Sequence, residues 1–189
     1  MSGIERCGLM SHSYVKGRTK ALRFYRVGGR LVLVDSPGYG TRGKVEWGNL
    51  FDAYTDTREQ YASPASYIAL NQTLLLFFSI RLKRIYILFT ARHGLNESDH
   101  QMLSHLSKKL VTPQGKQPFT LQAIITKADQ LLPKELSTNV PLIQKAIWES
   151  APLCLPAIVT STAMSPHFQI NLVRQNIAEA CGLSELNVE

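Results

Sequence analysis

The sequence is poor in cysteine, and the few cysteines it has are scattered. Its three cysteines, Cys7, Cys154 and Cys181, form no CxxC pair and no Cys/His cluster. This spacing argues against a structural zinc site, which needs several ligands at close intervals. A sparse, odd number of cysteines also favours a reducing compartment.

Long apolar runs are missing as well. The most apolar segment, residues 73–90, is interrupted by three basic side chains, and the two remaining blocks are too short to span a bilayer. We therefore expect no stable membrane insertion. The two blocks instead predict the end of a buried helix at residues 74–80 and a buried strand at residues 84–90.

Acidic residues are fewer than basic ones. The 189 residues include 21 Lys and Arg against 14 Asp and Glu, which gives a net charge of +7. This excess favours an anionic partner, such as RNA or a membrane surface, without choosing between them. The length suits one domain, and the apolar fraction of 44% is enough for a packed core.

The first twenty residues are basic, with Glu5 as their one acidic residue. Such a start resembles a weak mitochondrial presequence. A frayed or truncated N-terminus is the alternative, so a mitochondrial and a cytoplasmic location both stay open. Residues 1–16 are expected to be irregular in either case.

Apolar periodicity and turn residues predict an alternation of strands and helices. Gly28-Gly29 is a hairpin signal, which makes the first two strands antiparallel. The later alternation predicts an α/β fold of three layers, with a mostly parallel sheet, one antiparallel edge strand and helices on both faces. The expected strands are residues 20–27, 31–34, 84–90, 119–125 and 157–159, the expected helices are residues 65–80, 96–110, 142–150 and 168–181, and residues 41–63 are expected to form a loop with a short helix.

One stretch, LVLVDSPGYG at Leu31–Gly40, joins an apolar strand to a polar turn. An apolar run of this length predicts a strand buried on both faces, with Asp35 at its carboxyl end. Open α/β sheets bind ligands at that end, and a carboxylate followed by a glycine suits a magnesium–phosphate site. The alternative is a buried strand that ends in a plain polar turn.

Two further motifs also follow predicted strands. They are TKAD at Thr126–Asp129 and STA at Ser161–Ala163. Each has an ordinary explanation by itself, because Asp129 could cap a helix and the STA segment could be a plain turn. Together with DSPG, in this order and on these strand ends, they are specific, and the sequence looks like a P-loop GTPase of the Ras-like superclass.

The resemblance can be narrowed to one family. Gly17-Arg18-Thr19, DSPGYG, Ala91–Gly94 with Asp99 behind it, and Ile125–Gln130 resemble the EngB family of P-loop GTPases. The resemblance implies an EngB-type G domain over residues 17–189. It also implies binding of GTP or GDP with Mg²⁺, and a role in assembly of the large ribosomal subunit. The partners would then be a guanine nucleotide and the ribosomal large subunit or its rRNA, and no DNA is expected.

The resemblance assigns the base-binding residues to the two later motifs. Asp129 would accept hydrogen bonds from the guanine N1 and exocyclic amine, and Lys127 would lay its aliphatic stem along the base. Thr126 belongs to the same motif. Backbone amides of Ser161, Thr162 and Ala163 would offer an N–H to the guanine oxygen.

The resemblance assigns the phosphate and metal contacts to the earlier motifs. Asp35 would hold Mg²⁺ through water, and the Gly38 N–H would reach the γ-phosphate. Thr19 would be the second magnesium contact and a switch that closes on the triphosphate. The alternative for Thr19 is an exposed strand residue.

Tyr39 stands where many GTPases place a glutamine that orients the attacking water. An aromatic ring cannot position water in the same way. Hydrolysis is therefore expected to be slow, or to depend on another residue, a potassium ion or the ribosome. No residue is assigned as catalytic.

The phosphate-binding sequence GxxxxGK[ST] does not occur in the 189 residues. The first strand of the GTPase fold and its P-loop are therefore expected to be missing, which leaves an open seam beside the strand at residues 31–34. Either the chain is an incomplete version of a longer protein, or it is a degenerate GTPase that relies on a partner. Enzyme activity is left open, and a nucleotide-independent module that binds rRNA or the ribosome is the alternative function.

Two other kinds of site are poorly supported. An α/β hydrolase needs GxSxG, whereas Ser36 sits in DSPG. His93, His100 and His105 are spaced by seven and five residues, which does not stack them on one helix face as metal ligands at i and i+4. A longer loop at residues 111–118 than in compact bacterial members favours a eukaryotic organellar protein, on resemblance alone.

Overall fold

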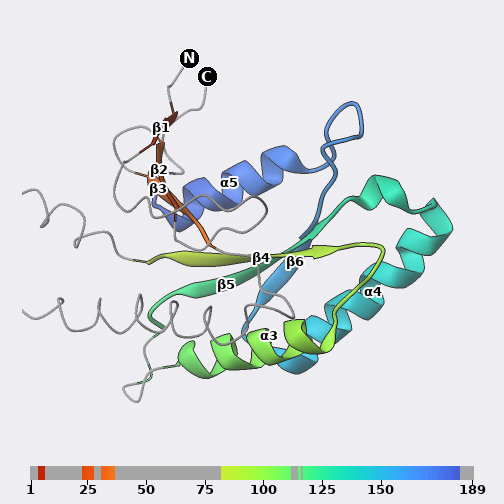
Figure 1. The fold of residues 1–189 in the computed structure, drawn as a ribbon, viewed down its shortest axis with the longest axis horizontal. Coiled ribbons are helices and arrows are strands. Elements are labelled where there is room, and N and C mark those ends of the chain that lie inside the picture. The colour runs from red at the N-terminus through yellow and green to blue at the C-terminus, as the bar shows by residue number, and fades with distance from the viewer. Residues whose placement is uncertain are drawn as a thin grey trace, which may run out of the picture. The chain divides into compact units, whose positions relative to one another are not determined.

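The computed structural model divides the chain into two units, Met1–Arg81 and Leu82–Glu189. The described elements of both units are labelled in Figure 1. Several predictions fall outside the residues that the structure describes, among them the loop at residues 41–63 and the helix at residues 65–80. The described residues are 4–6, 23–27, 31–36, 82–111, 115 and 117–183.

The first unit contains a three-stranded antiparallel sheet. Its order is β1-β2-β3, and Val27 lies opposite both Ile4 and Leu31. The antiparallel pairing expected around Gly28-Gly29 is confirmed. The strands are β1 (Ile4–Arg6), β2 (Arg23–Val27) and β3 (Leu31–Asp35).

The prediction that residues 1–16 are irregular was wrong at β1. Three residues are too few to show the period-two pattern of a strand, so this strand is recognisable only by its pairing with β2. Pairing across a sheet is a tertiary feature, which a local reading of the sequence does not contain.

The prediction that β3 is buried on both faces was also wrong. Leu33 is 38% exposed, and the other apolar residues of β3 are only half-buried. Asp35 does occupy the last position of the strand, as predicted, and it is exposed. The reason is that β3 is an edge strand of its sheet, and an edge strand in a small antiparallel sheet need not be covered on both faces.

The prediction of a mostly parallel sheet is confirmed for the strands of the second unit. The described strands form two sheets, and β3 belongs to the antiparallel one. Neighbouring segments can pair antiparallel through a short turn, as β2 and β3 do.

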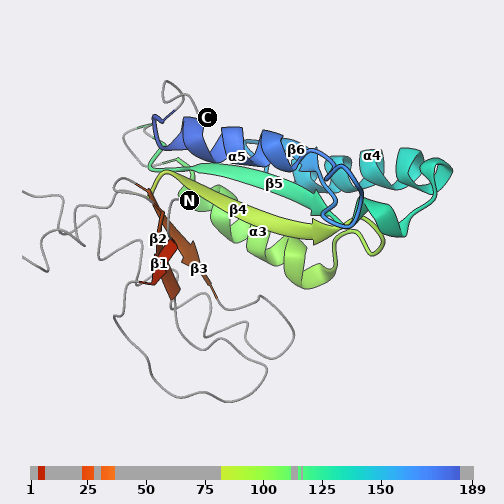
Figure 2. The same cartoon turned by 90° about the horizontal axis from the view of Figure 1, so that it is seen from above.

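The second unit is a parallel α/β unit of three layers. Its sheet has the order β4-β5-β6, with Arg84 opposite Thr120 at one end and Thr90 opposite Thr126 at the other. Helices α3 and α4 lie on one face and α5 on the other (Figures 1 and 2). The predicted parallel sheet with helices on both faces is confirmed for this unit. Its elements are β4 (Arg84–Thr90), α3 (Glu97–Lys109), β5 (Thr120–Thr126), the 3₁₀ turn η2 (Ala128–Gln130), α4 (Pro133–Ser150), β6 (Leu155–Val159) and α5 (Ile170–Ala180).

The main core lies between the sheet and the α3–α4 layer. Central strand β5 is buried along Leu121–Ile125, as expected for a parallel strand with helices on both faces. Its odd-numbered side chains face α3 and α4, because the alternate residue Gln122 points to α5. The buried apolar residues of this layer include Ile87, Phe89, Leu103, Leu106, Leu121, Ala123, Ile125, Ile143 and Ile147.

The local sequence signals locate the start of α3 correctly but place the start of α4 too late. Asn96 caps α3, since its Oδ1 accepts from the Asp99 amide at 3.1 Å while Asp99 Oδ2 accepts from the Asn96 amide at 2.9 Å. Helix α4 begins at Pro133 rather than Leu142, and Pro141 lies inside it. An internal proline normally ends a helical pattern, which explains the short prediction. No described helix is long and apolar enough to cross a membrane.

The core can be tested with a matched pair of strand leucines. Leu121 is fully buried, whereas Leu88 on neighbouring β4 is 65% exposed. Leu121→Ala should lower the free energy of unfolding by about 2–5 kcal/mol, because it leaves a cavity. Leu88→Ala should change it by about 0.5 kcal/mol or less. Urea unfolding followed by circular dichroism measures both, and equal effects would contradict this core.

Cys154, just before β6, provides a pH test of packing. Burial raises the pKa of its thiol to about 11, against a smaller lowering by a backbone hydrogen bond at Ala123. An unfolded thiol ionises near pH 8.5, so the folded state should lose stability from this group as pH rises from about 8.5 to 11. Alkylation of the Cys154 peptide by iodoacetamide should show the higher midpoint in native protein and the lower one in urea. Equal midpoints would count against a buried thiol.

Candidate functional site

The two later motifs meet at the carboxyl edge of the parallel sheet. Thr126–Asp129 leaves the end of β5, and Ser161 follows β6 after Thr160. Two backbone hydrogen bonds join the segments: the Thr160 amide donates to the Ile125 carbonyl at 2.7 Å, and the Ala128 amide donates to the Thr160 carbonyl at 3.1 Å. The structure therefore brings TKAD and STA together, at the edge where parallel sheets bind ligands.

Ser161 holds the Asp129 carboxylate. The Ser161 hydroxyl donates a short hydrogen bond to Asp129 Oδ1, and Ser161 itself is only 1% exposed. Its oxygen accepts from the backbone amides of Ala163 at 3.1 Å and Met164 at 3.3 Å. A hydroxyl has one proton and two lone pairs, so Ser161 is fully satisfied. Asp129 is exposed, and as a carboxylate it keeps lone pairs for a further donor.

The backbone at Lys127 turns the motif outward. Lys127 has φ 58° and ψ 41°, a left-handed conformation that is uncommon for a residue with a side chain. Its carbonyl accepts from the Gln130 amide at 3.1 Å, which starts η2. Lys127 and Asp129 are exposed while Ala128 between them is fully buried. The lysine and the aspartate therefore both stand at the surface of the sheet's edge.

The alternative that Asp129 caps a helix is not what the structure shows. Asp129 lies within η2, and its carboxylate bonds to the Ser161 side chain on a different segment. The N-cap position of α4 is Leu132, whose backbone amide donates to Glu135 Oε2 at 2.8 Å. The STA segment forms a turn, which was the alternative explanation for it. Its serine also donates a hydrogen bond to Asp129, so the turn is not a plain one.

Thr126 has a structural role that differs from the roles of the other residues in its motif. Its hydroxyl donates to the Phe89 carbonyl at 3.0 Å, and its own carbonyl accepts from the Ala91 amide at 2.9 Å. These bonds tie the ends of β4 and β5 together beneath the site. Thr162 and Ala163 are exposed in the turn after β6.

The phosphate half of the predicted site consists of one residue of the first unit and of residues outside the described ones. Asp35 belongs to the first unit, and Gly38, Thr19 and Tyr39 lie outside the described residues. Their assigned contacts stay predictions. Thr160 was missed at the base half, because it contributes backbone groups, and such contacts leave no signal in residue type.

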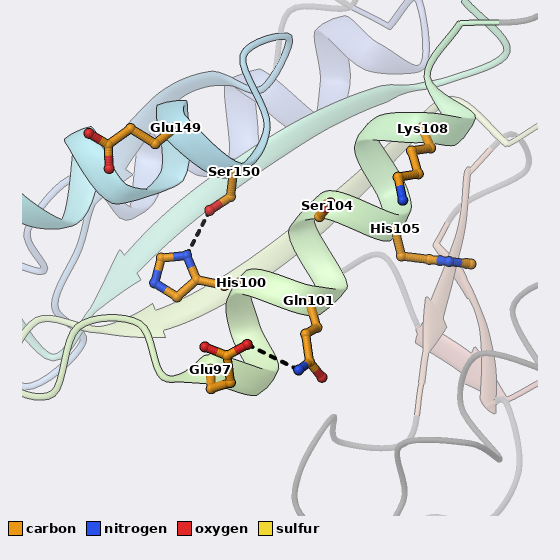
Figure 3. Close-up of a pocket in the computed structure, with 8 residues that line it drawn as sticks. All are labelled: Glu97, His100, Gln101, Ser104, His105, Lys108, Glu149 and Ser150. Atoms are coloured by element: carbon orange, nitrogen blue, oxygen red, sulfur yellow. Dashed lines mark hydrogen bonds between the residues drawn. The ribbon is translucent and has the colours of Figure 1, made fainter.

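A separate hollow of about 510 Å³ lies between α3 and the end of α4 (Figure 3). His100 Nδ1 and Ser150 Oγ are 2.7 Å apart in it, and Ser150 donates to the Ala146 carbonyl at 2.9 Å. The Ser150 proton has two acceptors within reach, the His100 ring nitrogen and the Ala146 carbonyl, and the imidazole tautomer decides between them. None of the predicted nucleotide-binding residues lines this hollow, whose walls are Glu97, His100, Gln101, Ser104, His105, Lys108, Glu149 and Ser150.

The other histidines give no metal centre in the described part of the chain. There, no group of three His, Cys, Asp or Glu side chains is arranged to hold a metal ion. His93 is exposed in the turn after β4, and His105 lies on α3. Within the described ranges, the candidate site is therefore the carboxyl edge of β5 and β6.

The fold and this edge define a parallel α/β domain with a polar site at its strand ends. Comparison of the sequence with known proteins defines the class of protein more closely. No family model matches the chain. It is 31% identical over 166 residues to "Probable GTP-binding protein EngB" of Bradyrhizobium diazoefficiens, covering 85% of this chain and 63% of the relative. It is 28% identical over 181 residues to the protein of the same name from Caulobacter vibrioides, covering 91% and 69%.

A eukaryotic protein is also similar. "MIOREX complex component 8" of Saccharomyces cerevisiae is 27% identical over 179 residues, covering 90% of this chain and 46% of the yeast protein. The chain is thus a distant relative of the EngB GTP-binding proteins, which confirms the resemblance at that level. It spans less than two thirds of the length of the Bradyrhizobium relative.

The Ser161 contacts can be tested without a ligand. Ser161→Ala removes the acceptor for the Ala163 and Met164 amides and the donor to Asp129. Losing such a bond costs about 1–2 kcal/mol, so both amides should exchange with solvent roughly 5–30 times faster. Hydrogen exchange followed by NMR measures this. Ser165→Ala, in the same turn, is the control, and unchanged exchange in the Ser161 variant would refute the contacts.

Proposed function

We propose that the chain binds guanine nucleotides and that Asp129 recognises the base. The observation that carries this proposal is the Ser161 hydroxyl bond, which holds the Asp129 carboxylate at the carboxyl edge of the sheet. Guanine presents N1–H and an exocyclic amine as two neighbouring donors, which a carboxylate accepts together. Adenine presents an acceptor in place of N1–H, so it would face the carboxylate without a matching donor.

The surrounding groups complete the base site. The aliphatic stem of exposed Lys127 lies along the base, and Thr126 supports the motif by tying β5 to β4. The amides of Ala163 and Met164 already donate to Ser161 Oγ. We therefore assign the guanine oxygen to the backbone N–H of Thr162.

The phosphate and metal contacts are proposed on the resemblance. Asp35 is an exposed carboxylate at the end of its strand, which suits a water-mediated contact to Mg²⁺. The Gly38 N–H is assigned to the γ-phosphate and Thr19 to the metal. Magnesium bound with GTP would neutralise charge on the phosphates during hydrolysis.

The wider role is that of an EngB-type GTPase with a Ras-like fold over residues 17–189. It acts in assembly of the large ribosomal subunit, in mitochondria, with the cytoplasm as the alternative location. Similarity to EngB GTP-binding proteins and to a yeast protein supports this role. The net charge of +7 supports binding to rRNA, where basic side chains neutralise phosphates.

A second candidate function is a nucleotide-independent module that binds rRNA or the ribosome. The observation in its favour is that no GxxxxGK[ST] sequence occurs in the 189 residues. That loop normally cradles the nucleotide phosphates in its backbone amides. Without that loop, the excess of basic residues is the remaining feature that suits an anionic partner.

Titration of the chain with a fluorescent GDP analogue and Mg²⁺ tests the first function. We expect micromolar binding that Asp129→Asn weakens about 100-fold, because two charge-assisted hydrogen bonds to the base are disrupted. The same variant should gain affinity for the xanthine analogue, whose carbonyl replaces the guanine amine and accepts from an amide nitrogen.

The control is Glu149→Gln on α4, an exposed carboxylate that carries the same charge. It should leave GDP binding unchanged. Absence of binding at millimolar nucleotide, with rRNA affinity retained, would reject the guanine-binding function for this chain and support the module instead.

A further inference from the structure

Helix α5 is attached to the sheet in an unusual way. None of its side chains is fully buried, whereas α3 on the opposite face buries Met102, Leu103 and Leu106. Val173 and Ile177 of α5 are half-buried, so apolar contact is only partial. Polar contacts must therefore contribute to the placement of α5.

A cluster of four polar side chains joins α5 to the sheet: Asn176 of α5, Arg84 and Tyr86 of β4, and Gln122 of β5, here named the Asn176 cluster. Asn176 Oδ1 accepts from Arg84 Nη1 at 2.6 Å and from the Tyr86 hydroxyl at 2.9 Å. Arg84 Nη1 also donates to the Asn176 carbonyl at 3.1 Å. Asn176 Nδ2 donates to Gln122 Oε1 at 3.3 Å.

Gln122 extends the cluster to the third strand. It is 2% exposed, and its Nε2 donates to the Pro156 carbonyl of β6 at 2.7 Å. Arg84 Nε donates to Thr120 Oγ1 of β5 at 2.9 Å. Asn176 thus connects α5 to a network that reaches all three strands of this sheet. Gln122 is buried and the other three members are half-buried, so the loss of a partner costs most at Gln122.

Tyr86 is a proton donor in this cluster at neutral pH. Burial raises the pKa of its phenol, although the charge of neighbouring Arg84 opposes the shift. The hydroxyl therefore keeps its proton and donates it to Asn176 Oδ1.

The chain runs directly from the base site into α5. Ser161 and Phe168 pair through two backbone hydrogen bonds, from the Ser161 amide to the Phe168 carbonyl at 3.2 Å and from the Phe168 amide to the Ser161 carbonyl at 2.9 Å. Phe168 lies just before α5, which begins at Ile170. The placement of α5 thereby limits where Phe168, and with it Ser161, can lie.

We propose that Asn176 is a positioning residue for base recognition. By fixing α5 on the sheet it fixes Phe168, and the Ser161–Phe168 pair then holds the Ser161 hydroxyl against Asp129. The mechanical part of this inference stands by itself, whereas its consequence for the base rests on the proposed guanine-binding function. The two parts are therefore tested separately.

Amide hydrogen exchange at Ser161 and Phe168 tests the mechanical part without any ligand. Asn176→Ala should accelerate exchange at both amides about tenfold, because α5 is less firmly held. Asn176→Asp keeps the acceptor for Arg84 and Tyr86 but loses the donor to Gln122 Oε1, so its exchange rates should lie between those of Asn176→Ala and the parent. The control is Gln175→Ala, at the neighbouring exposed position of α5, which should behave as the parent.

Two further variants keep the test decisive. Asn176→Leu restores apolar volume without the hydrogen bonds, so rescue by leucine would mean that packing alone holds α5, and would overturn the proposal. Tyr86→Phe removes one hydrogen bond and preserves the ring, so it gives the answer if Asn176→Ala does not fold. If Asn176→Ala folds and its Ser161 and Phe168 amides exchange as in the parent, the proposal is overturned. If Asn176→Ala does not fold, parent-like exchange at both amides in Tyr86→Phe overturns the proposal.

The affinity ratio of guanosine to inosine tests the consequence for the base. Inosine lacks the exocyclic amine that Asp129 accepts, so the ratio reports how the carboxylate is placed. Asn176→Ala should lower the ratio about threefold to tenfold, whereas a purely structural loss would weaken both nucleosides equally and leave the ratio unchanged. If the parent binds neither nucleoside, the guanine-binding function fails, and the exchange rates at Ser161 and Phe168 still decide the mechanical part.

Discussion

The parallel pairing of β5 with β4 and β6 is the constraint on which the candidate site depends. It places the carboxyl ends of the three strands at one edge, so that segments far apart in the chain meet there. The Thr160 amide donates to the Ile125 carbonyl and the Thr160 carbonyl accepts from the Ala128 amide, which holds the two polar motifs in a fixed relation. Without this register the side chains of Asp129 and Ser161, which lie 32 residues apart in the chain, would not be within hydrogen-bond distance of each other.

Complete hydrogen bonding gives this edge its definition. Ser161 is buried, so each of its hydroxyl positions must be satisfied, and its single proton is committed to Asp129. The two amides that it accepts shape the turn that follows. The same principle applies beneath α5, where Asn176, Arg84, Tyr86 and Gln122 satisfy one another between the helix and the sheet. Satisfied polar groups, buried or half-buried, thus lie both beside the exposed Asp129 carboxylate and beneath α5.

Much of the second unit could be predicted from its sequence. β4, the Asn96 cap of α3 and the places of β5 and β6 follow from apolar runs and capping residues, which are local signals. The failures were non-local. β1 exists only through its pairing with β2, β3 lies at the edge of an antiparallel sheet rather than inside a parallel one, and α4 continues through Pro141. Of the predicted site residues, those of TKAD and STA were brought together, while Asp35 belongs to the other unit.

The sequence by itself determined the residue types at the strand ends, the alternation of strands and helices, and the resemblance to a GTP-binding family. It could do so because motifs and periodicity are properties of neighbouring residues. Only the tertiary structure decided that the Ser161 hydroxyl serves Asp129 rather than a turn alone, and that Asn176 joins α5 to the sheet. Both facts are hydrogen bonds between side chains that are far apart in the sequence. Such bonds depend on the relative positions of the folded segments, which local sequence patterns do not contain.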